Sequence, residues 1–402
     1  MQVIRKRHLA TFGVHAAALA TTWLYCRSAS AAPCADLNLP NPIYGAGGSA
    51  ITATLAKVAT ALAGAAEPVT ILFSDPGACN GFAQFADNRI TGTFKYWDAS
   101  GQQLTCDAPL AGQPADFAHM GNTADFCQGG ALPTDVRDFP GPVQTINVIT
   151  DKDSSQTAVS AEALYFVFGF GTEAQASPWT DDFSIFHRKT SSFVHLFIAD
   201  VVGVPATGFP GGETTVRNTN QEIVQAVAQA GAVDPEKPLG VVSGSAADQG
   251  AALVKTLAYQ HYDQSCGYLP DSSPTRLDKL NVRFGQYFLW TPGHFFSRVD
   301  SSGNPLNPTV AALIGWFTGS ENPPQGVDVT RLVIESGDVP ACAMRVTREG
   351  VTGAIRSFAP PQPCGCYFEQ VATGSTTCTG CTSDGECGGD TPSCRFGYCE
   401  AY

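Results

Sequence analysis

The chain has 402 residues, with 36 acidic against 23 basic side chains, so its formal net charge at pH 7 is −13. Binding to nucleic acid and to anionic membranes depends mainly on positive charge, so this balance argues against both classes of partner. The 14 cysteines exceed what a cytosolic enzyme normally carries. They predict an oxidising compartment in which most of the sulfur atoms are paired.

Residues 1–31 have the layout of a secretory signal. Three basic residues at 5–7 precede the apolar stretch 9–25 and the small-residue run SASAA, and cleavage is predicted after Ala31. The alternative is a lipid anchor at Cys26, which the bulky Tyr25 before it disfavours. No later stretch reaches the ~18 uninterrupted apolar residues of a membrane helix. We therefore expect a soluble protein that is secreted, periplasmic or held at the cell surface.

Removal of the signal changes two counts. Cys26 leaves with it, so 13 cysteines remain, and an odd number requires at least one free thiol or one intermolecular partner. Arg5, Lys6, Arg7 and Arg27 are also lost, and the remaining 19 basic against 36 acidic side chains give a net charge of about −17.

The first predicted strand, NPIY, leads into the glycine turn GAGGSA at residues 45–50, and a helix is predicted from Ser49 to Leu62. The turn fits the pattern G-x-G-x-x-A, which places a dinucleotide pyrophosphate on a helix N-terminus. The next predicted strand, VTILFS, ends beside Asp75, which is close to the position of the ribose-binding acid in dinucleotide-binding folds. Backbone N–H groups at Gly48 and Ser49 would suit any anion, however. An ordinary turn capped by Ser49 is the alternative, and the rest of the chain argues against a dinucleotide.

Strand-like and helix-like segments alternate over residues 32–360, which predicts an α/β fold. Further strands are predicted at 91–97, 115–120, 143–150, 183–188 and 240–242, and further helices at 161–168, 192–202, 220–230 and 308–317. This length exceeds one compact core, so we expect two lobes. Lobe I is expected at about 36–145 plus a return segment, and lobe II at about 146–260.

Two more segments are candidates for an anion site. In the segment HRKTSS a predicted strand ends near Arg188, and hydroxyl residues, including Ser191 and Ser192, lie at the start of an apolar helix. The guanidinium of Arg188 is therefore expected close to the free backbone N–H groups of this helix start, where both can bind an oxyanion. The alternative is an ordinary N-cap with Arg188 on the surface. The segment GACNGF, with Ala78 and Cys79, is predicted as a loop rich in backbone donors. Cys79 is expected to be structural, since no histidine lies nearby in sequence.

The character of the sequence changes at residues 361–402. Seven cysteines fall between Cys364 and Cys399 with almost no aliphatic residues, so disulfides rather than a core must hold this segment. The pair Cys378-x-x-Cys381 raises the alternative of zinc, but export and the uneven spacing favour disulfides. Their connectivity does not follow from spacing.

Enzyme motifs are sparse. The sequence lacks G-x-S-x-G, H-E-x-x-H and G-x-x-x-x-G-K-[ST], and its histidines have no metal-ligand spacing, so no cofactor, metal or catalytic residue is predicted. His261, five residues before Cys266, allows a Cys/His hydrolase as a remote alternative. A disulfide cysteine beside a packed histidine is the simpler interpretation.

The motifs GAGGSA, ILFSDPGACNG and ADFA, with Arg188 four residues before Ser192, resemble phosphate-type periplasmic solute-binding proteins of the type II periplasmic binding fold. VVSGSAAD, LAYQHYDQSCGYLPDS and DKLNVRFGQYFLWTPGH extend the resemblance over roughly residues 36–360. It implies two α/β lobes that close on an oxyanion held by helix N-termini, hydroxyls and an arginine. The tail ending in CRFGYC looks like the cysteine modules of exported myxobacterial proteins.

The match to the family's binding motifs is partial. The family's turn hydroxyl corresponds to Ser49, and the Arg and Ser of its R-x-x-x-S-G-T element correspond to Arg188 and Ser192. The Gly and Thr of that element are replaced by Phe193 and Val194. The serine expected in the glycine loop falls on Ala78. The family's SD pair falls on Met120 and Gly121, followed by Asn122, so the aspartate that accepts a proton from bound hydrogen phosphate is missing. Each unmatched donor or acceptor is worth ~1 to 3 kcal/mol, so these losses weaken phosphate binding.

Two hypotheses follow. The leading one is a non-enzymatic solute-binding protein for a small, phosphate-like anion, with an ABC permease as the partner that the resemblance implies. Its ligand would lie near Gly48, Ser49, Ala78, Cys79, Gly121, Asn122, Arg188, Ser191 and Ser192. The alternative is a surface protein that keeps the fold as a scaffold and contacts a cell-surface or extracellular partner through residues 364–402.

Overall fold

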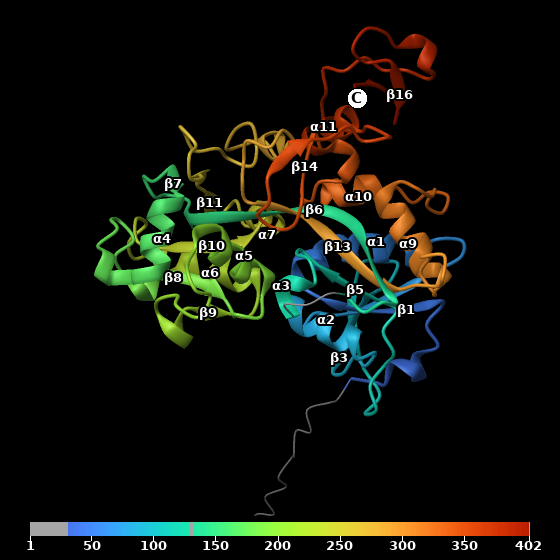
Figure 1. Cartoon of the computed structure of the whole chain (residues 1–402), viewed down its shortest axis with the longest axis horizontal. Helices are drawn as coiled ribbons and strands as arrows, with labels where there is room; N and C mark the ends of the chain where they lie inside the picture. Colours follow the sequence, from blue (N-terminus) through green and yellow to red (C-terminus); the bar gives the residue numbers. More distant parts are fainter. Residues whose placement is uncertain (1–30, 129–131, 402) are drawn as a thin grey trace, which may run out of the picture.

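The computed structural model describes residues 31–128 and 132–401, and the predicted signal segment, apart from its last residue, lies outside them (Figure 1). The chain forms two α/β lobes side by side, with the C-terminal segment projecting from one edge. Within the described ranges, no helix combines the length and the apolar character needed to cross a bilayer.

The elements have the following bounds. The strands are β1 (Pro42–Gly47), β2 (Thr70–Ser74), β3 (Thr93–Trp97), β4 (Gln103–Asp107), β5 (Phe117–Met120), β6 (Val136–Asp151), β7 (Ala158–Ser160), β8 (Ile185–Arg188), β9 (Val216–Arg217), β10 (Leu239–Ser243), β11 (Val254–Thr256), β12 (Ala258–Gln260), β13 (Trp290–Arg298), β14 (Val346–Arg348), β15 (Ile355–Ser357), β16 (Ser393–Arg395) and β17 (Tyr398–Glu400). The helices are α1 (Thr52–Ala63), α2 (Ala78–Ala86), α3 (Asp125–Gln128), α4 (Ala161–Phe170), α5 (Phe193–Val202), α6 (Asn220–Gly231), α7 (Gly244–Gln249), α8 (Leu280–Arg283), α9 (Pro308–Thr318), α10 (Val329–Glu335) and α11 (Gly365–Thr373).

One long strand, β6, connects the lobes. Its first half pairs with β13, and β13 pairs in turn with β5 of the first lobe. Its second half pairs with β10 and β11 of the second lobe. The strand order is therefore β4-β3-β2-β1-β5-β13-β6-β10-β8-β9, which runs continuously from one lobe into the other. This is the two-lobed α/β architecture that the sequence predicts, and it is confirmed.

Helices cover the sheet in each lobe. In the first lobe α1, α9 and α10 pack on a buried layer that includes Phe73, Phe117 and Phe295. In the second lobe α6 packs Ile223 and Val227 against the sheet. Periodic apolar residues on α1, α6 and α9 explain why the positions of these three helices follow from the sequence. Helix α10 is absent from the sequence prediction.

The structure corrects the predicted glycine turn. Gly45 and Gly47 lie inside β1, and the chain turns only at Gly48 before a short 3-10 helix, η2 (Ser49–Ile51), leads into α1. A Cβ on Gly45 would lie 2.2 Å from the Phe117 ring, and one on Gly47 would lie 2.0 Å from the carbonyl oxygen of His119. These two glycines are therefore explained by close packing between β1 and β5.

The structure also corrects the predicted loop at residues 77–82. Ala78 begins α2, whose start is set by Gly77 at φ +117°. Gly81 faces β1 so closely that a Cβ there would lie 2.3 Å from the backbone nitrogen of Gly47. Glycine here permits the helix to lie directly on the strand, although its presence made the segment look like a loop.

Twelve cysteines of the described ranges form six disulfides, namely Cys34–Cys106, Cys79–Cys127, Cys342–Cys364, Cys366–Cys378, Cys381–Cys394 and Cys387–Cys399. Among the described residues Cys266 is the one free cysteine, and it is exposed. The predicted disulfide-bonded C-terminal module is confirmed, and Cys342–Cys364 ties it to the preceding α/β region. The predicted module boundary at residue 361 falls inside the loop that this disulfide closes.

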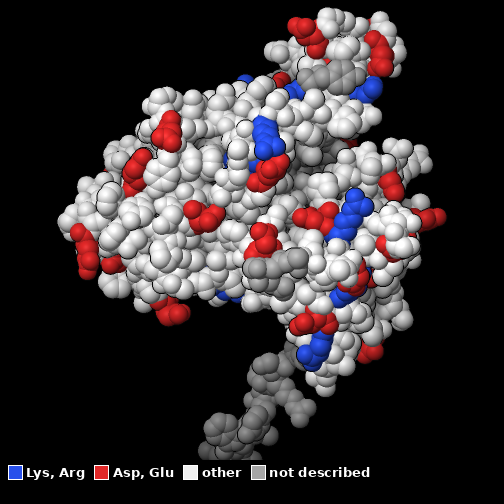
Figure 2. Space-filling model, in the orientation of Figure 1, with Lys and Arg blue, Asp and Glu red and all other residues white. Residues whose placement is uncertain are grey.

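Charged side chains are spread thinly over one face of the molecule. On the face drawn in Figure 2, acidic and basic groups stand singly or in small mixed clusters among uncharged residues, and no large basic patch is visible. This face offers no surface suited to a phosphate backbone.

Candidate functional site

A small cavity lies where the two lobes meet. It is lined by Gly48, Ser49, Ala50, Gly77, Ala78, Arg188, Ser192, Phe193 and Val194. The first five come from the starts of α1 and α2 in one lobe, and the other four come from the end of β8 and the start of α5 in the other lobe. The space open to water is about 10 Å³, which is room for roughly one molecule.

Arg188 supplies the charge of this cavity. Its side chain is 3% exposed, and the guanidinium donates to Asn220 Oδ1 at 3.0 Å and to the carbonyl oxygen of Asn218 at 2.6 Å. Its Nη1 and Nη2 also lie 3.4 and 3.3 Å from Ser49 Oγ in the opposite lobe. The Nε atom is buried and has no partner among the described residues.

Arg188 makes no ion pair with a carboxylate in the described part of the chain. Burial lowers the pKa of Arg188 to about 10, although Asp75 and Glu222 act in the opposite direction from a distance. Asp75 is instead paired with Lys95 at 2.7 Å. Buried cations are normally paired with an anionic group. The positive charge of Arg188 lacks such a partner among the described residues, and an anion in the cavity would compensate it.

A chain of polar side chains runs behind Arg188. Asn220, which accepts from the guanidinium, donates through Nδ2 to Ser243 Oγ at 3.0 Å. Ser243 Oγ lies 3.2 Å from Ser245 Oγ at the start of α7. These bonds fix the orientation of Asn220 and hold the guanidinium toward Ser49.

The lobes are in direct contact beside the cavity. A Cβ on Gly77 would lie 2.9 Å from the carbonyl oxygen of Ser191, and one on Gly121 would lie 2.6 Å from the Phe193 ring. Phe193 is 3% exposed. Its ring therefore fills space between the lobes that a smaller residue would leave open.

The structure divides the predicted ligand-binding residues into three groups. Gly48, Ser49, Ala78, Arg188 and Ser192 line the cavity. Ser191 lies at the edge where the lobes touch, and Gly121 lies beneath Phe193. Cys79 is bonded to Cys127, and Asn122 is buried with its Nδ2 directed at the same Cys127 sulfur.

Two partners of Arg188 are absent from the sequence prediction. Asn218 and Asn220 lie after β9, which pairs in parallel with β8, so the sheet register brings them beside Arg188. The segment RNTNQE shows an N-cap pattern that indicates the start of α6. It carries no signal that Asn220 faces a guanidinium.

The remote hydrolase alternative finds no support in the contacts of its two residues. His261 Nδ1 lies 3.0 Å from Tyr259 Oη, and its ring stacks on Phe288 with a centroid separation of 3.5 Å. Burial lowers the pKa of His261. In the described ranges, no hydrogen bond joins His261 to Cys266.

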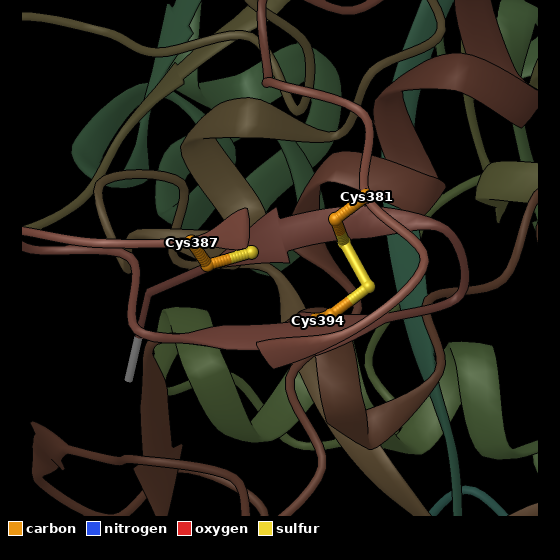
Figure 3. A group of neighbouring side chains, drawn as sticks. All are labelled: Cys381, Cys387 and Cys394. Atoms are coloured by element: carbon orange, nitrogen blue, oxygen red, sulfur yellow. A yellow bond between two sulfur atoms is a disulfide. The ribbon is translucent and has the colours of Figure 1, made fainter. Parts of the chain in front are cut away.

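Three sulfur atoms of the C-terminal module lie close enough together to resemble a metal site. The sulfurs of Cys381, Cys387 and Cys394 are within 4.8 Å of one another (Figure 3). Cys381 is bonded to Cys394, and Cys387 is bonded to Cys399. Disulfide sulfurs are not thiolates, and zinc binds thiolates, so this cluster is two adjacent disulfides.

Solved structures similar to the chain include two groups of proteins. A putative phosphate ABC transporter substrate-binding protein with bound phosphate from Clostridium perfringens shares 10% identity, covering 75% of this chain and 100% of that one, with a TM-score of 0.48. A possible phosphate-binding protein from Planctomyces limnophilus shares 13% identity, covering 75% and 93%, with a TM-score of 0.44. An OxyR mutant from Corynebacterium glutamicum shares 12% identity, covering 75% and 68%, with a TM-score of 0.41.

No family model matches the chain. No curated protein matches it either. Structural likeness at these identities and TM-scores assigns no ligand or partner to the chain.

Proposed function

We propose that the protein is an extracytoplasmic binding protein for a small anion, which is held between the lobes by Arg188, Ser49 and Ser192. The main observation behind this proposal is that Arg188, which lines the cavity, is a buried cation with no carboxylate partner among the described residues. Its buried Nε atom also has no hydrogen-bond partner there. An anion in the cavity would displace water and accept charge-assisted hydrogen bonds from Arg188, which are roughly twice as strong as hydrogen bonds between neutral groups. The six disulfides support a location outside the cytoplasm.

Two helix starts add donors to the same cavity. Gly48 and Ser49 lead into α1, and Ser192 is the N-cap residue of α5, without a side-chain capping bond of its own. The Ser192 hydroxyl is therefore available to a ligand. Helix N-termini favour negative charge because their first N–H groups lack partners within the helix.

The volume of the cavity limits the ligand in the closed arrangement. Space for roughly one water suits a monatomic anion such as chloride. A polyatomic oxyanion requires the lobes to separate or the Phe193 ring to move, because this ring lies against Gly121. Movement of the lobes around β6 and β13 is the hinge type of closure known for two-lobed binding proteins.

Thermal unfolding of the mature protein tests the proposal. Chloride, phosphate, sulfate and acetate are each added up to millimolar concentration in a buffer otherwise free of small anions. An anion present at about 100 times its Kd stabilises the folded state by about 2.7 kcal/mol, enough to raise the Tm visibly. Absence of a shift with all four would contradict the proposal.

A second candidate function is a scaffold that binds no small ligand and contacts a cell-surface partner through the C-terminal module. Phe193 and Val194 favour it, because both line the cavity with apolar surface and leave little volume. A loss of cell-surface retention on deletion of residues 364–402, without any anion response of the full chain, would support this candidate. If an anion does bind, delivery to an ABC permease is the proposed consequence.

A further inference from the structure

A larger cavity lies at the junction of both lobes with the C-terminal module, and we call it the junction cavity. Its volume is about 240 Å³, and it is lined by Ser245, Asp248, Gln249, Leu277, Lys279, Ile334, Glu335, Ser336, Gly337, Phe368, Val371 and Ala372. These residues come from α7 in one lobe, from α10 and the turn after it in the other, from the segment before α8, and from α11 of the module. Figure 1 shows α11 lying over α10 at this place.

One wall of the junction cavity carries a buried charge cluster. Lys279 is 1% exposed, and its Nζ lies 2.8 Å from Asp248 Oδ2 and 3.1 Å from Asp271 Oδ1. Two carboxylates against one ammonium leave an excess of one formal negative charge. Glu335, also on the wall, is exposed and is already paired with Arg331 at 3.3 Å and with Lys57 at 4.0 Å.

The opposite wall is apolar and comes mainly from the module. Phe368, Val371 and Ala372 of α11 face the cavity together with Ile334 of α10, and Phe368 is 1% exposed. A cavity with one apolar wall and a few polar groups on the other is the usual composition of small-molecule sites.

The apolar wall is held in place by bonds to the body of the protein. The Cys342–Cys364 disulfide joins the start of α11 to the segment after α10. Arg283 donates to the carbonyl oxygen of Gly365 at 3.1 Å and lies over the Phe368 ring at 4.8 Å. Tyr367 donates its hydroxyl to Asp328, which caps α10. The cavity is therefore pre-formed, which lowers the entropy lost when a ligand binds.

We propose that the junction cavity is a second binding site, which takes a small organic cation with its ammonium beside Asp248 and its apolar group against Phe368, Val371 and Ala372. The excess negative charge selects a cation over an anion, and the α11 wall requires an apolar group. The volume is slightly below the roughly 300–1,000 Å³ typical of ligand pockets, so the ligand is small. None of these residues lines the cavity at Arg188, so this proposal does not depend on the anion site.

Three probes of nearly equal size test the charge selection. 2-Phenylethylamine, 2-phenylethanol and phenylacetate share one phenyl group and differ in carrying a positive, a zero or a negative charge. In titration calorimetry with the mature full chain we expect the amine to bind at one site, and the alcohol and the carboxylate to bind roughly tenfold or more weakly. Failure of the amine to bind, or equal binding of the alcohol, would overturn the proposal. Preferred binding of phenylacetate would also overturn it, because Lys279 would then be the recognising group.

Variants locate the binding event. Ala372→Trp fills the junction cavity without changing charge, and we expect it to weaken amine binding roughly tenfold or more. Val233→Trp, at a position 89% exposed and outside the cavity lining, is the matched control and should leave binding unchanged. Arg188→Met should also leave amine binding unchanged, which separates this site from the anion site. Unchanged amine affinity in a folded Ala372→Trp protein would overturn the proposal.

Discussion

Arg188 and Ser49 are 139 residues apart in sequence, yet the guanidinium Nη2 lies 3.3 Å from the Ser49 hydroxyl across the boundary between the lobes. Arg188 ends β8 in one lobe, and Ser49 precedes α1 in the other. The contact joins the buried guanidinium of Arg188 to a neutral hydroxyl oxygen, so it does not neutralise the positive charge of Arg188. It therefore holds the lobes together while the cationic charge remains available to an anion.

Replacement of Arg188 by Met should change stability little without ligand and should abolish the stabilisation that a bound anion gives. In an anion-free buffer we expect the unfolding free energy to stay within about 1 kcal/mol of the wild type, because the lost hydrogen bonds are offset by removal of a buried unpaired charge. With anion at about 100 times its Kd, the wild type should gain about 2.7 kcal/mol and Arg188→Met nothing. Denaturant unfolding measures both values.

Arg217→Met is the matched control for this charge removal. Arg217 pairs with Arg188 in the β8–β9 register, but its guanidinium donates to the carbonyl oxygens of Thr214 and Val216. It should retain the full anion response. A loss of response in Arg217→Met equal to that in Arg188→Met would show a non-specific charge effect.

Replacement of Phe193 by Ala should open the anion cavity. Removal of a buried phenyl ring costs about 3–5 kcal/mol of stability, so the Tm without ligand should fall. The space vacated against Gly121 should accommodate a polyatomic oxyanion. The Tm rise with phosphate should therefore be larger in Phe193→Ala than in the wild type. An equal or smaller rise would argue that Phe193 does not limit the ligand, and Phe193→Leu offers a milder variant if the alanine protein does not fold.

Much of the fold could be predicted because local signals agree with tertiary structure. The predicted helices at 161–168, 220–230 and 308–317 correspond to α4, α6 and α9 within a few residues, since a Ser, Thr or Asn cap precedes each apolar face. The prediction missed α2 because Gly81 is typical of a loop, whereas in the structure it allows α2 to pack directly on β1. It missed β13, where Pro292 and Gly293 lie at a bulge opposite β6.

The site could be predicted only in part. Short motifs indicate Ser49, Arg188 and Ser192, since a hydroxyl or guanidinium beside a helix start has a recognisable pattern. The contact of Phe193 with Gly121 and the bond from Arg188 to Asn220 depend on how the lobes and strands meet. The pairing of Cys342 with Cys364 likewise requires spatial proximity, which cysteine spacing does not give.

Asp338 should make stability depend on pH. Its carboxylate is 3% exposed and accepts from Thr54 Oγ1, and burial, with Asp248 acting in the same direction, raises its pKa to about 7. Because the folded pKa exceeds the unfolded value of ~3.9, the stabilising contribution is complete below about pH 4 and is lost as pH rises to about 7. The loss over this range is about 4 kcal/mol, as an order of magnitude.

Asp338→Asn tests this dependence by replacing the carboxyl group with a neutral amide. The decline of unfolding free energy between about pH 4 and 7 should become shallower than in the wild type. Glu67→Gln, which removes an exposed carboxylate, should follow the wild-type profile. Parallel profiles for wild type and Asp338→Asn in urea unfolding would contradict the expected role of Asp338.

The Cys342–Cys364 disulfide should stabilise the docking of the C-terminal module. It closes a loop over a sequence separation of 22 residues, so the double variant Cys342→Ser/Cys364→Ser should lose roughly 3 kcal/mol in the chain-entropy model. Thermal unfolding measures the change. Cys266→Ser is the control, because Cys266 is exposed and forms no disulfide, and the Tm of this variant should match that of the wild type. Equal Tm values for the double variant and the wild type would mean that other contacts hold α11.

The most direct measurement is titration calorimetry of chloride, phosphate, sulfate and acetate into the wild-type protein and into Arg188→Met. We expect at least one anion to bind the wild type with a stoichiometry of about one. We expect Arg188→Met to lose this binding, because a hydrogen bond to a charged group in a buried site contributes about 1.5–3 kcal/mol. Binding of none of the four anions, or equal binding to Arg188→Met, would contradict the proposed anion site.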